Sequence, residues 1–177
     1  KGLEFPVVIC CGLGKKFNLR DVQQDVLLHK ELGLGPKFVD IEKRIYNETL
    51  PQLAIKRKMK IENLSEEMRI LYVALTRPID KLILIGSVRE LEREAKKWLR
   101  GTTLFNLLKG QSYLDWICSA LARHIDGEPI RELGKASFNE SHIDDEEKSR
   151  WTINLLNKSD IYLKEIEKNE GNIEERL

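Results

Sequence analysis

The stretch FPVVICC, residues 5–11, decides the fold class of this chain. It shows no alternation of polar and apolar side chains, and Val7, Val8 and Ile9 are β-branched. Such a run is typical of a strand that is covered on both faces of a parallel sheet. KLILIG at 81–86 repeats the pattern. Because the connection between the two runs is far longer than a hairpin loop, the pattern predicts a parallel pair and an α/β fold.

The connection divides into two parts. Residues 12–47 are rich in Gly, Asp and Lys and include a Gly-x-Gly-Pro turn at 33–36, which predicts an excursion with little regular structure. Apolar residues at helical spacing then predict a long helix over 51–76, starting near Thr49 or Leu50. Pro78 ends this helix, and a break near residues 63–65 stays open.

The pattern of the second half of the chain predicts helices followed by a polar segment. Two amphipathic helices are predicted at 88–99 and 104–122, separated by Gly101. An apolar stripe marks the second of these helices. The predicted parts of the chain are an α/β part at 1–87, a helical extension at 88–127 and a polar linker at 128–177. The linker is expected to hold a mobile loop at 128–148, a short strand at 151–156 and a charged helix at 162–177.

Composition places the chain among globular proteins. Of its 177 residues, 41% are hydrophobic and 33% are charged, which fits one compact domain with a heavily solvated surface. The net charge of +1 gives no overall attraction to nucleic acid. No apolar run approaches the roughly 20 residues of a membrane span, and the three cysteines lack disulfide or zinc spacing. We expect a soluble cytoplasmic protein. Because Lys1 precedes a strand by only four residues, we also expect a piece of a longer protein.

The GLGKK run at 12–16 suggests a phosphate-binding loop only superficially. A Walker-type loop needs a glycine, four residues and then Gly-Lys followed by Ser or Thr. Here position 9 is Ile and position 16 is Lys, so the spacing and the hydroxyl are both wrong. The run therefore predicts a turn leaving the end of a strand, with phosphate contact by Lys15 and Lys16 left open.

EEMRILYVALTR, residues 66–77, is more specific. A helix that packs through Leu71 and Leu75 delivers Arg77 at its C-terminal end, close to the following strand. There the guanidinium can reach an anion held by another domain. It can also cap the carbonyls of its own helix, and the bare residues favour this second interpretation.

Two blocks of the sequence point to a family. KGLEFPVV resembles motif V, and EEMRILYVALTR resembles motif VI, of the superfamily 1 DNA helicases of the UvrD, Rep and PcrA type. The wider run from GLGKKFNLRD to TLPQLAIKRK is similar to the AddA family of Gram-positive helicase-nucleases. The resemblance covers about residues 1–125. It implies a partial RecA-like parallel sheet, the second half of the second helicase domain, followed by a helical C-terminal extension.

The resemblance also implies a function and a site. Such proteins are ATP-dependent 3′–5′ DNA helicase/exonuclease subunits of complexes that repair double-strand breaks by recombination, and they use ATP and Mg²⁺. Lys1, Gly2 and Glu4 match positions beside the nucleotide, with Glu4 expected on the ribose, and Arg77 matches the arginine that reaches the γ-phosphate. The resemblance also implies supporting roles for Thr76 and Arg69. Pro78 stands where the family usually has Ala, which leaves the presentation of Arg77 open.

The implied partners are single-stranded DNA and an AddB-type subunit in the parent protein, with no membrane. The isolated chain is expected to be inactive, to bind no cofactor of its own and to self-associate through exposed sheet edges. A non-catalytic DNA- or protein-binding module on a helicase-derived scaffold is the alternative. The basic run Lys56, Arg57, Lys58 and Lys60 favours a solvated helix face over a DNA contact. Of the three tryptophans, Trp116 is expected in the core, and base stacking is left open for Trp98 and Trp151.

Overall fold

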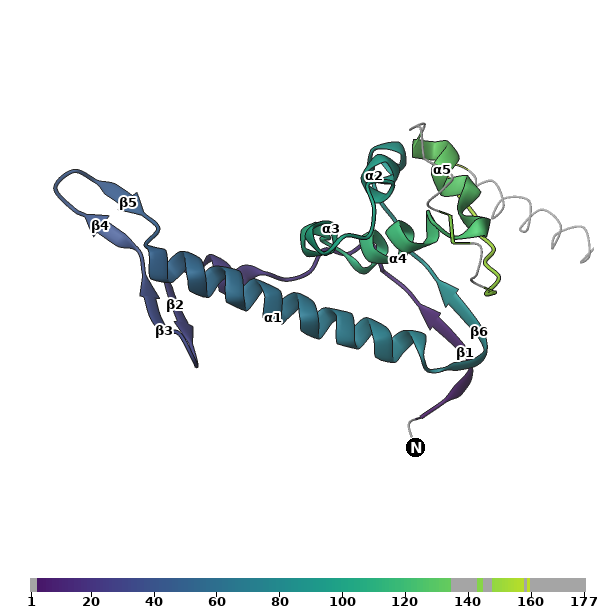
Figure 1. Cartoon of the computed structure of the whole chain (residues 1–177), viewed down its shortest axis with the longest axis horizontal. Coiled ribbons are helices and arrows are strands. Elements are labelled where there is room, and N and C mark those ends of the chain that lie inside the picture. Colours follow the sequence, from purple (N-terminus) through teal and green to yellow (C-terminus); the bar gives the residue numbers. More distant parts are fainter. Residues whose placement is uncertain (1–2, 135–142, 145–147, 158, 160–177) are drawn as a thin grey trace, which may run out of the picture.

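The computed structural model describes residues 3–134, 143–144, 148–157 and 159. One long helix, α1 (Leu50–Leu75), runs through the molecule. A two-stranded sheet and a group of short helices lie at one end of this helix, and two small hairpins lie at the other (Figure 1).

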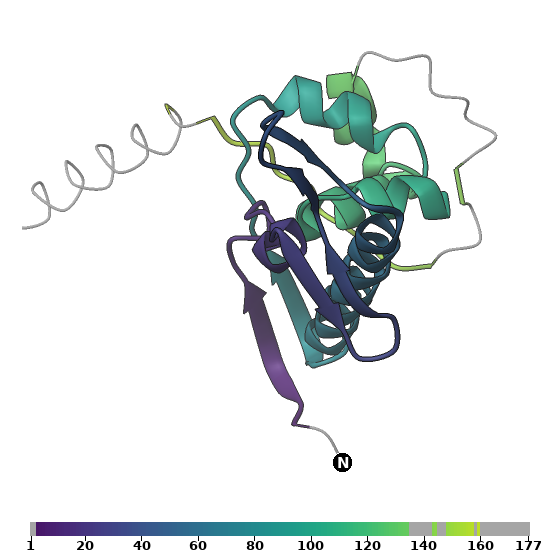
Figure 2. The same ribbon diagram turned by 90° about the vertical axis from the view of Figure 1, so that its left-hand side faces the viewer.

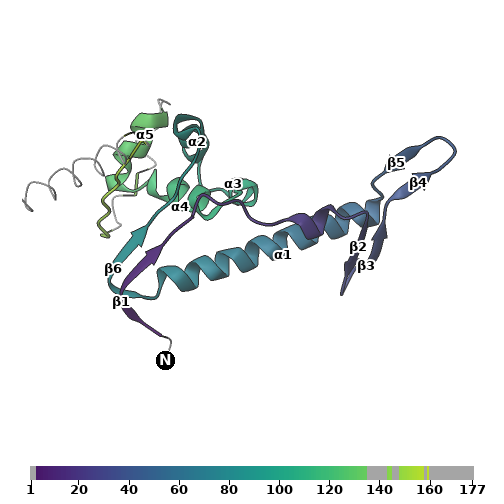
Figure 3. The same cartoon turned by 180° about the vertical axis from the view of Figure 1, so that it is seen from behind.

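The sheet confirms the predicted parallel pair. Strand β1 (Phe5–Cys10) pairs in parallel with β6 (Pro78–Leu84), in a register that sets Phe5 opposite Pro78 and Cys10 opposite Leu84. The two strands lie side by side in Figures 2 and 3. Strand β6 begins earlier than the predicted Lys81, at a proline, because the first residue of a strand needs no ladder N–H. Its register is irregular just after this point.

The prediction that β1 is covered on both faces is wrong. Cys10 and Leu84 pack into a core with Leu64 and Leu71 of α1 and with Trp116. On the other face, alternate residues of β1 remain about half exposed: Phe5 at 48%, Val7 at 49% and Ile9 at 57%. Among the described residues the sheet has only two strands and is packed on one face. Strand β1 therefore carries more apolar side chains than the described part of the chain buries.

The segment 12–47 is more regular than predicted. Strand β2 (Val26–His29) pairs antiparallel with β3 (Gly33–Pro36), and β4 (Phe38–Asp40) pairs with β5 (Ile45–Asn47). A short 3₁₀ turn, η1 (Arg20–Gln23), precedes them. The Gly-x-Gly-Pro sequence is therefore a strand. Gly35 lies directly on α1, where a Cβ atom would meet the Gln52 Cα at 2.8 Å, so packing against the helix decides this structure.

His29 closes the first hairpin and ties it to α1. This residue is 6% exposed, and its Nδ1 accepts hydrogen bonds from the Glu31 and Leu32 amides, each at 3.2 Å. Because Nδ1 accepts both of these hydrogen bonds, it carries no proton, and the proton of the neutral ring lies on Nε2. Nε2 therefore donates to the Glu62 carboxylate at 3.1 Å.

Helix α1 confirms the predicted long helix and runs without the break considered near residues 63–65. Thr49 is the N-cap and accepts from the Gln52 amide at 3.3 Å, while Pro51 occupies the first turn, where a missing N–H costs nothing. The Ser65 hydroxyl donates to the Ile61 carbonyl, so this polar residue sits within the helix without interrupting it.

The helical extension contains more elements than predicted. Helix α2 (Leu91–Trp98) corresponds to the first expected helix, and Gly101, at φ 111°, ends the turn after it. The second expected helix is two helices, α3 (Leu104–Lys109) and α4 (Tyr113–Leu121). The chain breaks between them because Ser112 caps α4 by accepting from the Asp115 amide. Trp116 is buried, as predicted.

The first residues of the predicted polar linker are helical. A short 3₁₀ turn, η2 (Ile125–Gly127), leads into α5 (Glu128–Gly134), so the loop predicted from 128 is wrong in its first seven residues. Ile130 of α5 joins a core with Ala95 and Trp98 of α2. No strand forms at 151–156, where the Trp151 amide donates to Asp126 instead. The helix predicted at 162–177 lies outside the described residues. None of the described helices combines the length and apolarity that crossing a membrane requires.

Candidate functional site

Arg77 lies in the short connection between α1 and β6, and both its backbone and its side chain hold the start of β1. The Phe5 amide donates to the Arg77 carbonyl at 3.0 Å. The Arg77 Nη1 donates to the Leu3 carbonyl, also at 3.0 Å. The two sequence blocks singled out above, residues 1–8 and 66–77, are thus in direct contact.

The helix end is capped by another residue. The Thr76 hydroxyl donates to the carbonyls of Tyr72 and Val73, at 3.0 and 3.1 Å. The Arg77 guanidinium is directed to Leu3 across the chain rather than to the carbonyls of α1, so the helix-capping interpretation of its side chain is wrong. Thr76 therefore ends the helix and leaves Arg77 available for another role.

Glu4 lies on the same edge as Arg77. It is exposed and stands between Leu3 and Phe5, the two residues that are bonded to Arg77. The structure thus places a carboxylate and a guanidinium at one open end of the sheet. Lys1 and Gly2 lie outside the described residues.

The chemistry of this edge suits part of a nucleotide. The guanidinium has five N–H donors in a planar fork, which matches phosphate oxygens. Within the described part of the chain only one acceptor, the Leu3 carbonyl, engages them. Glu4 can accept hydrogen bonds from sugar hydroxyls. The described residues contain no group of three or more His, Cys, Asp or Glu side chains that could hold a metal ion.

Arg69 is already engaged. It forms a two-point ion pair with Glu66 one turn earlier on α1, with Nε 2.9 Å from Oε2. This hydrogen bond lowers the pKa of the Glu66 carboxyl below its ordinary value. Arg69 lies eight residues before Arg77, about 12 Å along the helix axis, so it does not share the Arg77 edge.

A contact that no sequence pattern indicates links the helical extension to α1. The Tyr113 hydroxyl donates to the Glu67 carboxylate. Burial, and then this hydrogen bond, raise the pKa of Tyr113 to about 12. Glu67 belongs to the block at 66–77, but the two residues are 46 positions apart, and neither stretch carries a local sign of their contact.

The same two blocks lie inside a recognised family. The model of the UvrD-like helicase C-terminal domain matches residues 1–89, which is half of the chain and includes both Glu4 and Arg77. The chain belongs to the UvrD-like helicase C-terminal domain family. The RecA-like character expected of its parallel sheet is consistent with this assignment.

Similar proteins extend the likeness beyond this UvrD-like domain. The chain is 55% identical over 168 residues to the A subunit of the ATP-dependent helicase/nuclease from Alkaliphilus oremlandii, covering 95% of the chain and 14% of that protein. It is 47% identical over 183 residues to the protein of the same name from Thermoanaerobacter sp. strain X514, covering 100% and 14%. The protein of that name from Syntrophomonas wolfei is 44% identical over 179 residues, again with 100% and 14% covered. The chain thus spans about one seventh of the length of these relatives.

Proposed function

We propose that this chain supplies the motif V and motif VI side of the ATP site in an ATP-dependent 3′–5′ DNA helicase/exonuclease. The names of its relatives support the parent activity. We further propose, from the resemblance of the two blocks to motifs V and VI, that the parent uses ATP with Mg²⁺, acts on single-stranded DNA and works with an AddB-type partner in the recombinational repair of double-strand breaks. The domain division proposed with it has a helicase part at 1–87, a helical extension at 88–127 and a linker at 128–177.

One observation carries this proposal. The arginine of the second block bonds to the backbone of the first block, at an exposed end of the sheet, and leaves most of its donors without an acceptor among the described residues. The remaining N–H donors of its guanidinium are therefore available to an anion such as a phosphate. The Arg77 carbonyl and Nη1 are bonded to the start of β1, and the other guanidinium N–H groups have no acceptor among the described residues.

Roles for the residues follow from their chemistry. Arg77 would stabilise negative charge on the transferred γ-phosphoryl group, an effect of about 10³ to 10⁵ in rate for arginines of this kind. Glu4 would accept hydrogen bonds from the ribose hydroxyls, with Lys1 and Gly2 beside the nucleotide. The described residues fit only these groups, so the Mg²⁺ ligands and the opposite wall of the site would come from the rest of the parent protein.

Substitution of Arg77 in the full-length parent tests the proposal. Arg77→Ala is expected to lower ATP turnover by about 10³-fold or more while sparing most nucleotide binding, since it removes charge stabilisation in the transition state. DNA-stimulated ATPase rates and nucleotide binding by fluorescence measure the two effects. Arg57→Ala is the matched control, because it removes an exposed arginine of α1 that lies outside the block.

The outcomes separate clearly. A loss of turnover with Arg77→Ala but not with Arg57→Ala supports the proposal. Near-normal turnover by Arg77→Ala removes Arg77 from catalysis and favours a non-catalytic module. The 177-residue chain alone is expected to show no ATPase activity, because the Mg²⁺ ligands and the opposite wall of the site are proposed to come from the rest of the parent protein. Its self-association through the sheet edges is a further expectation, which sedimentation at several concentrations checks.

A further inference from the structure

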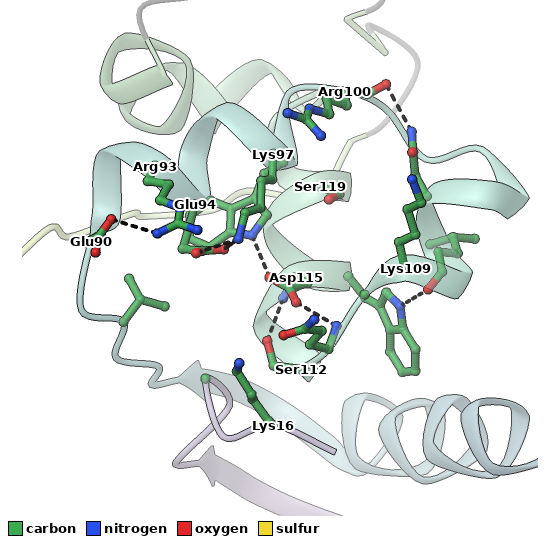
Figure 4. Close-up of a pocket in the computed structure, with 18 of the residues that line it drawn as sticks. Lys16, Glu90, Arg93, Glu94, Lys97, Arg100, Lys109, Ser112, Asp115 and Ser119 are labelled. Atoms are coloured by element: carbon green, nitrogen blue, oxygen red, sulfur yellow. Dashed lines mark hydrogen bonds and ion pairs between the residues drawn. The ribbon is translucent and has the colours of Figure 1, made fainter. Parts of the chain in front are cut away.

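A cleft opens at the other end of the sheet from Arg77. It lies among α2, α3 and α4, and Lys16 from the turn after β1 also lines it (Figure 4). Gly14 of the same turn packs against the Ser87 backbone beyond β6. Arg77 contacts the beginning of β1, whereas this cleft follows the carboxyl ends of both strands. In open α/β sheets, the carboxyl ends of the strands are where ligands usually bind.

The cleft concentrates positive charge. The whole chain has a net charge of +1, but the described residues that line this cleft include six basic and only three acidic side chains. The acidic ones are engaged locally. Glu90 pairs with Arg93 at 3.2 Å, and Glu94 pairs with Lys97 at 2.7 Å. The two Asp115 oxygens accept hydrogen bonds from the Trp98 indole at 3.0 Å and the Gln111 amide at 2.8 Å.

The other four cations of the cleft are exposed, and none of them has an ion pair within the described part of the chain: Lys16, Arg89, Arg100 and Lys109. Three of these come from well-separated places, Lys16 from the turn after β1, Arg100 from the turn after α2 and Lys109 from the end of α3. Lys109 lies over the Phe105 ring at 4.0 Å, which holds its stem without cancelling its charge. Unpaired cations from different elements around one cleft suit an extended polyanion.

The aromatic residues of the cleft exclude one mode of recognition. Trp98 and Trp116 are 3% and 6% exposed, so neither ring face is open for a base to stack on it. Both indole N–H groups are also used, by Asp115 and by the Leu107 carbonyl at 2.9 Å. A nucleic acid in this cleft would therefore be held by its phosphates and not by its bases.

The geometry points to a binding site for the sugar-phosphate backbone of single-stranded DNA in this cleft, independent of base sequence. The choice of DNA among polyanions rests on the proposed function. The site itself does not involve Arg77. It assigns the helical extension a direct contact with the substrate strand, separate from the nucleotide edge.

The test measures the anisotropy of a fluorescein-labelled oligothymidylate with the 177-residue chain across a salt series. The variant Lys16→Ala/Arg100→Ala/Lys109→Ala is expected to bind about tenfold more weakly or worse. Its salt slope should fall by about 2, because each phosphate contact on a single strand contributes about 0.7. The control Lys30→Ala/Arg57→Ala/Lys81→Ala removes the same charge from exposed cations outside the cleft and should bind normally, with circular dichroism confirming the fold of both.

The alternatives give different results. Equal binding by the cleft variant and the unsubstituted chain overturns the proposal, as does an equal loss in both triple variants. Stronger competition by inorganic pyrophosphate or ATP than by unlabelled oligothymidylate also overturns it, because that identifies a small-anion site. The ATPase test reads turnover by Arg77→Ala in the full-length parent, whereas the cleft test reads DNA binding by the 177-residue chain, so a failure of one is distinguishable from a failure of the other.

A second measurement needs no substitution in the cleft. Acetylation of the unsubstituted chain, read by mass spectrometry, should show Lys16 and Lys109 protected by oligothymidylate, with Lys30 and Lys81 unprotected. Equal modification of all four with and without DNA would contradict the site.

Discussion

The helical extension and the sheet edge differ in how completely this chain builds them. In the extension, α2, α4 and α5 enclose a finished core whose members are almost fully buried: Ala95 at 0%, Trp98 at 3%, Ala122 at 0% and Ile130 at 2%. In the sheet, the apolar residues of one face of β1 are about half exposed. Stability is therefore concentrated in the extension, while the residues proposed for catalysis belong to the half-covered part.

The polar groups of the two regions show the same contrast. The buried Trp98 indole donates to Asp115, which also accepts from the Gln111 amide, so the network is closed. Arg77 meets a single backbone carbonyl among the described residues. A closed network contributes to folding, whereas open donors are available to a ligand.

The largest expected effect is in the extension. Trp98→Ala should lower the free energy of unfolding by about 3 to 5 kcal/mol, because it empties a packed core. Urea unfolding followed by circular dichroism measures this loss. Phe5→Ala, at a 48% exposed aromatic on β1, is the control and should cost much less. Equal losses for the two variants would contradict the contrast between the regions.

A smaller effect should appear at alkaline pH. Burial, and then the Asp115 charge, raise the pKa of the Cys118 thiol from 9.0 to about 12 in the folded chain. The unfolded chain then loses its proton first, so stability is fully present below pH 9 and falls as the pH rises towards 12. The slope from this group is at most about 1.4 kcal/mol per pH unit.

Cys118→Ala isolates this contribution. Tyr113, whose pKa is also raised to about 12, keeps its own alkaline loss in both proteins. The variant should therefore lose less stability than the unsubstituted chain between pH 9 and 12, as measured by urea unfolding at each pH. Parallel curves for the two proteins would show that Cys118 does not contribute.

The smallest expected effect is at the site edge. Arg77→Ala should change the free energy of unfolding by less than about 0.5 kcal/mol, because its side chain makes one hydrogen bond, to a backbone carbonyl at the exposed start of β1. The thermal midpoint of the isolated chain checks this. A large loss would make Arg77 a structural residue and would weaken the inference that it is held for a ligand.

Sequence reasoning succeeded where the signal is local and periodic. The unbroken apolar runs identified β1 and β6, and helical spacing with a start near Thr49 or Leu50 identified α1. It failed for the hairpins at 26–47 and for the division between α3 and α4, because these depend on distant contacts. Gly35 forms a strand because α1 lies against it, and residues 110–112 form a break where Trp116 and the Ser112 cap meet.

For the candidate site, the sequence proposed Arg77 and Glu4 through the family resemblance, but it did not predict the hydrogen bond from Arg77 to Leu3. The sequence does not give the distance in space between residues 1–8 and residues 66–77, because a long connection separates them along the chain. It also missed the basic cleft, whose residues come from segments that are individually ordinary in charge. The local density of charge at a surface depends on which segments lie together there, and the composition of the whole chain does not show it.

By itself, the sequence determined the parallel strands, the long helix between them and the family to which residues 1–89 belong. These features follow from side-chain pattern, which is a property of neighbouring residues. Only the tertiary structure decided that Arg77 is hydrogen-bonded to the start of β1. It also decided that cations from the turn after β1, the turn after α2 and the end of α3 surround one cleft. Such placements depend on the packing of segments far apart in the chain, and that packing is fixed by burial and closure of the whole core rather than by any one stretch.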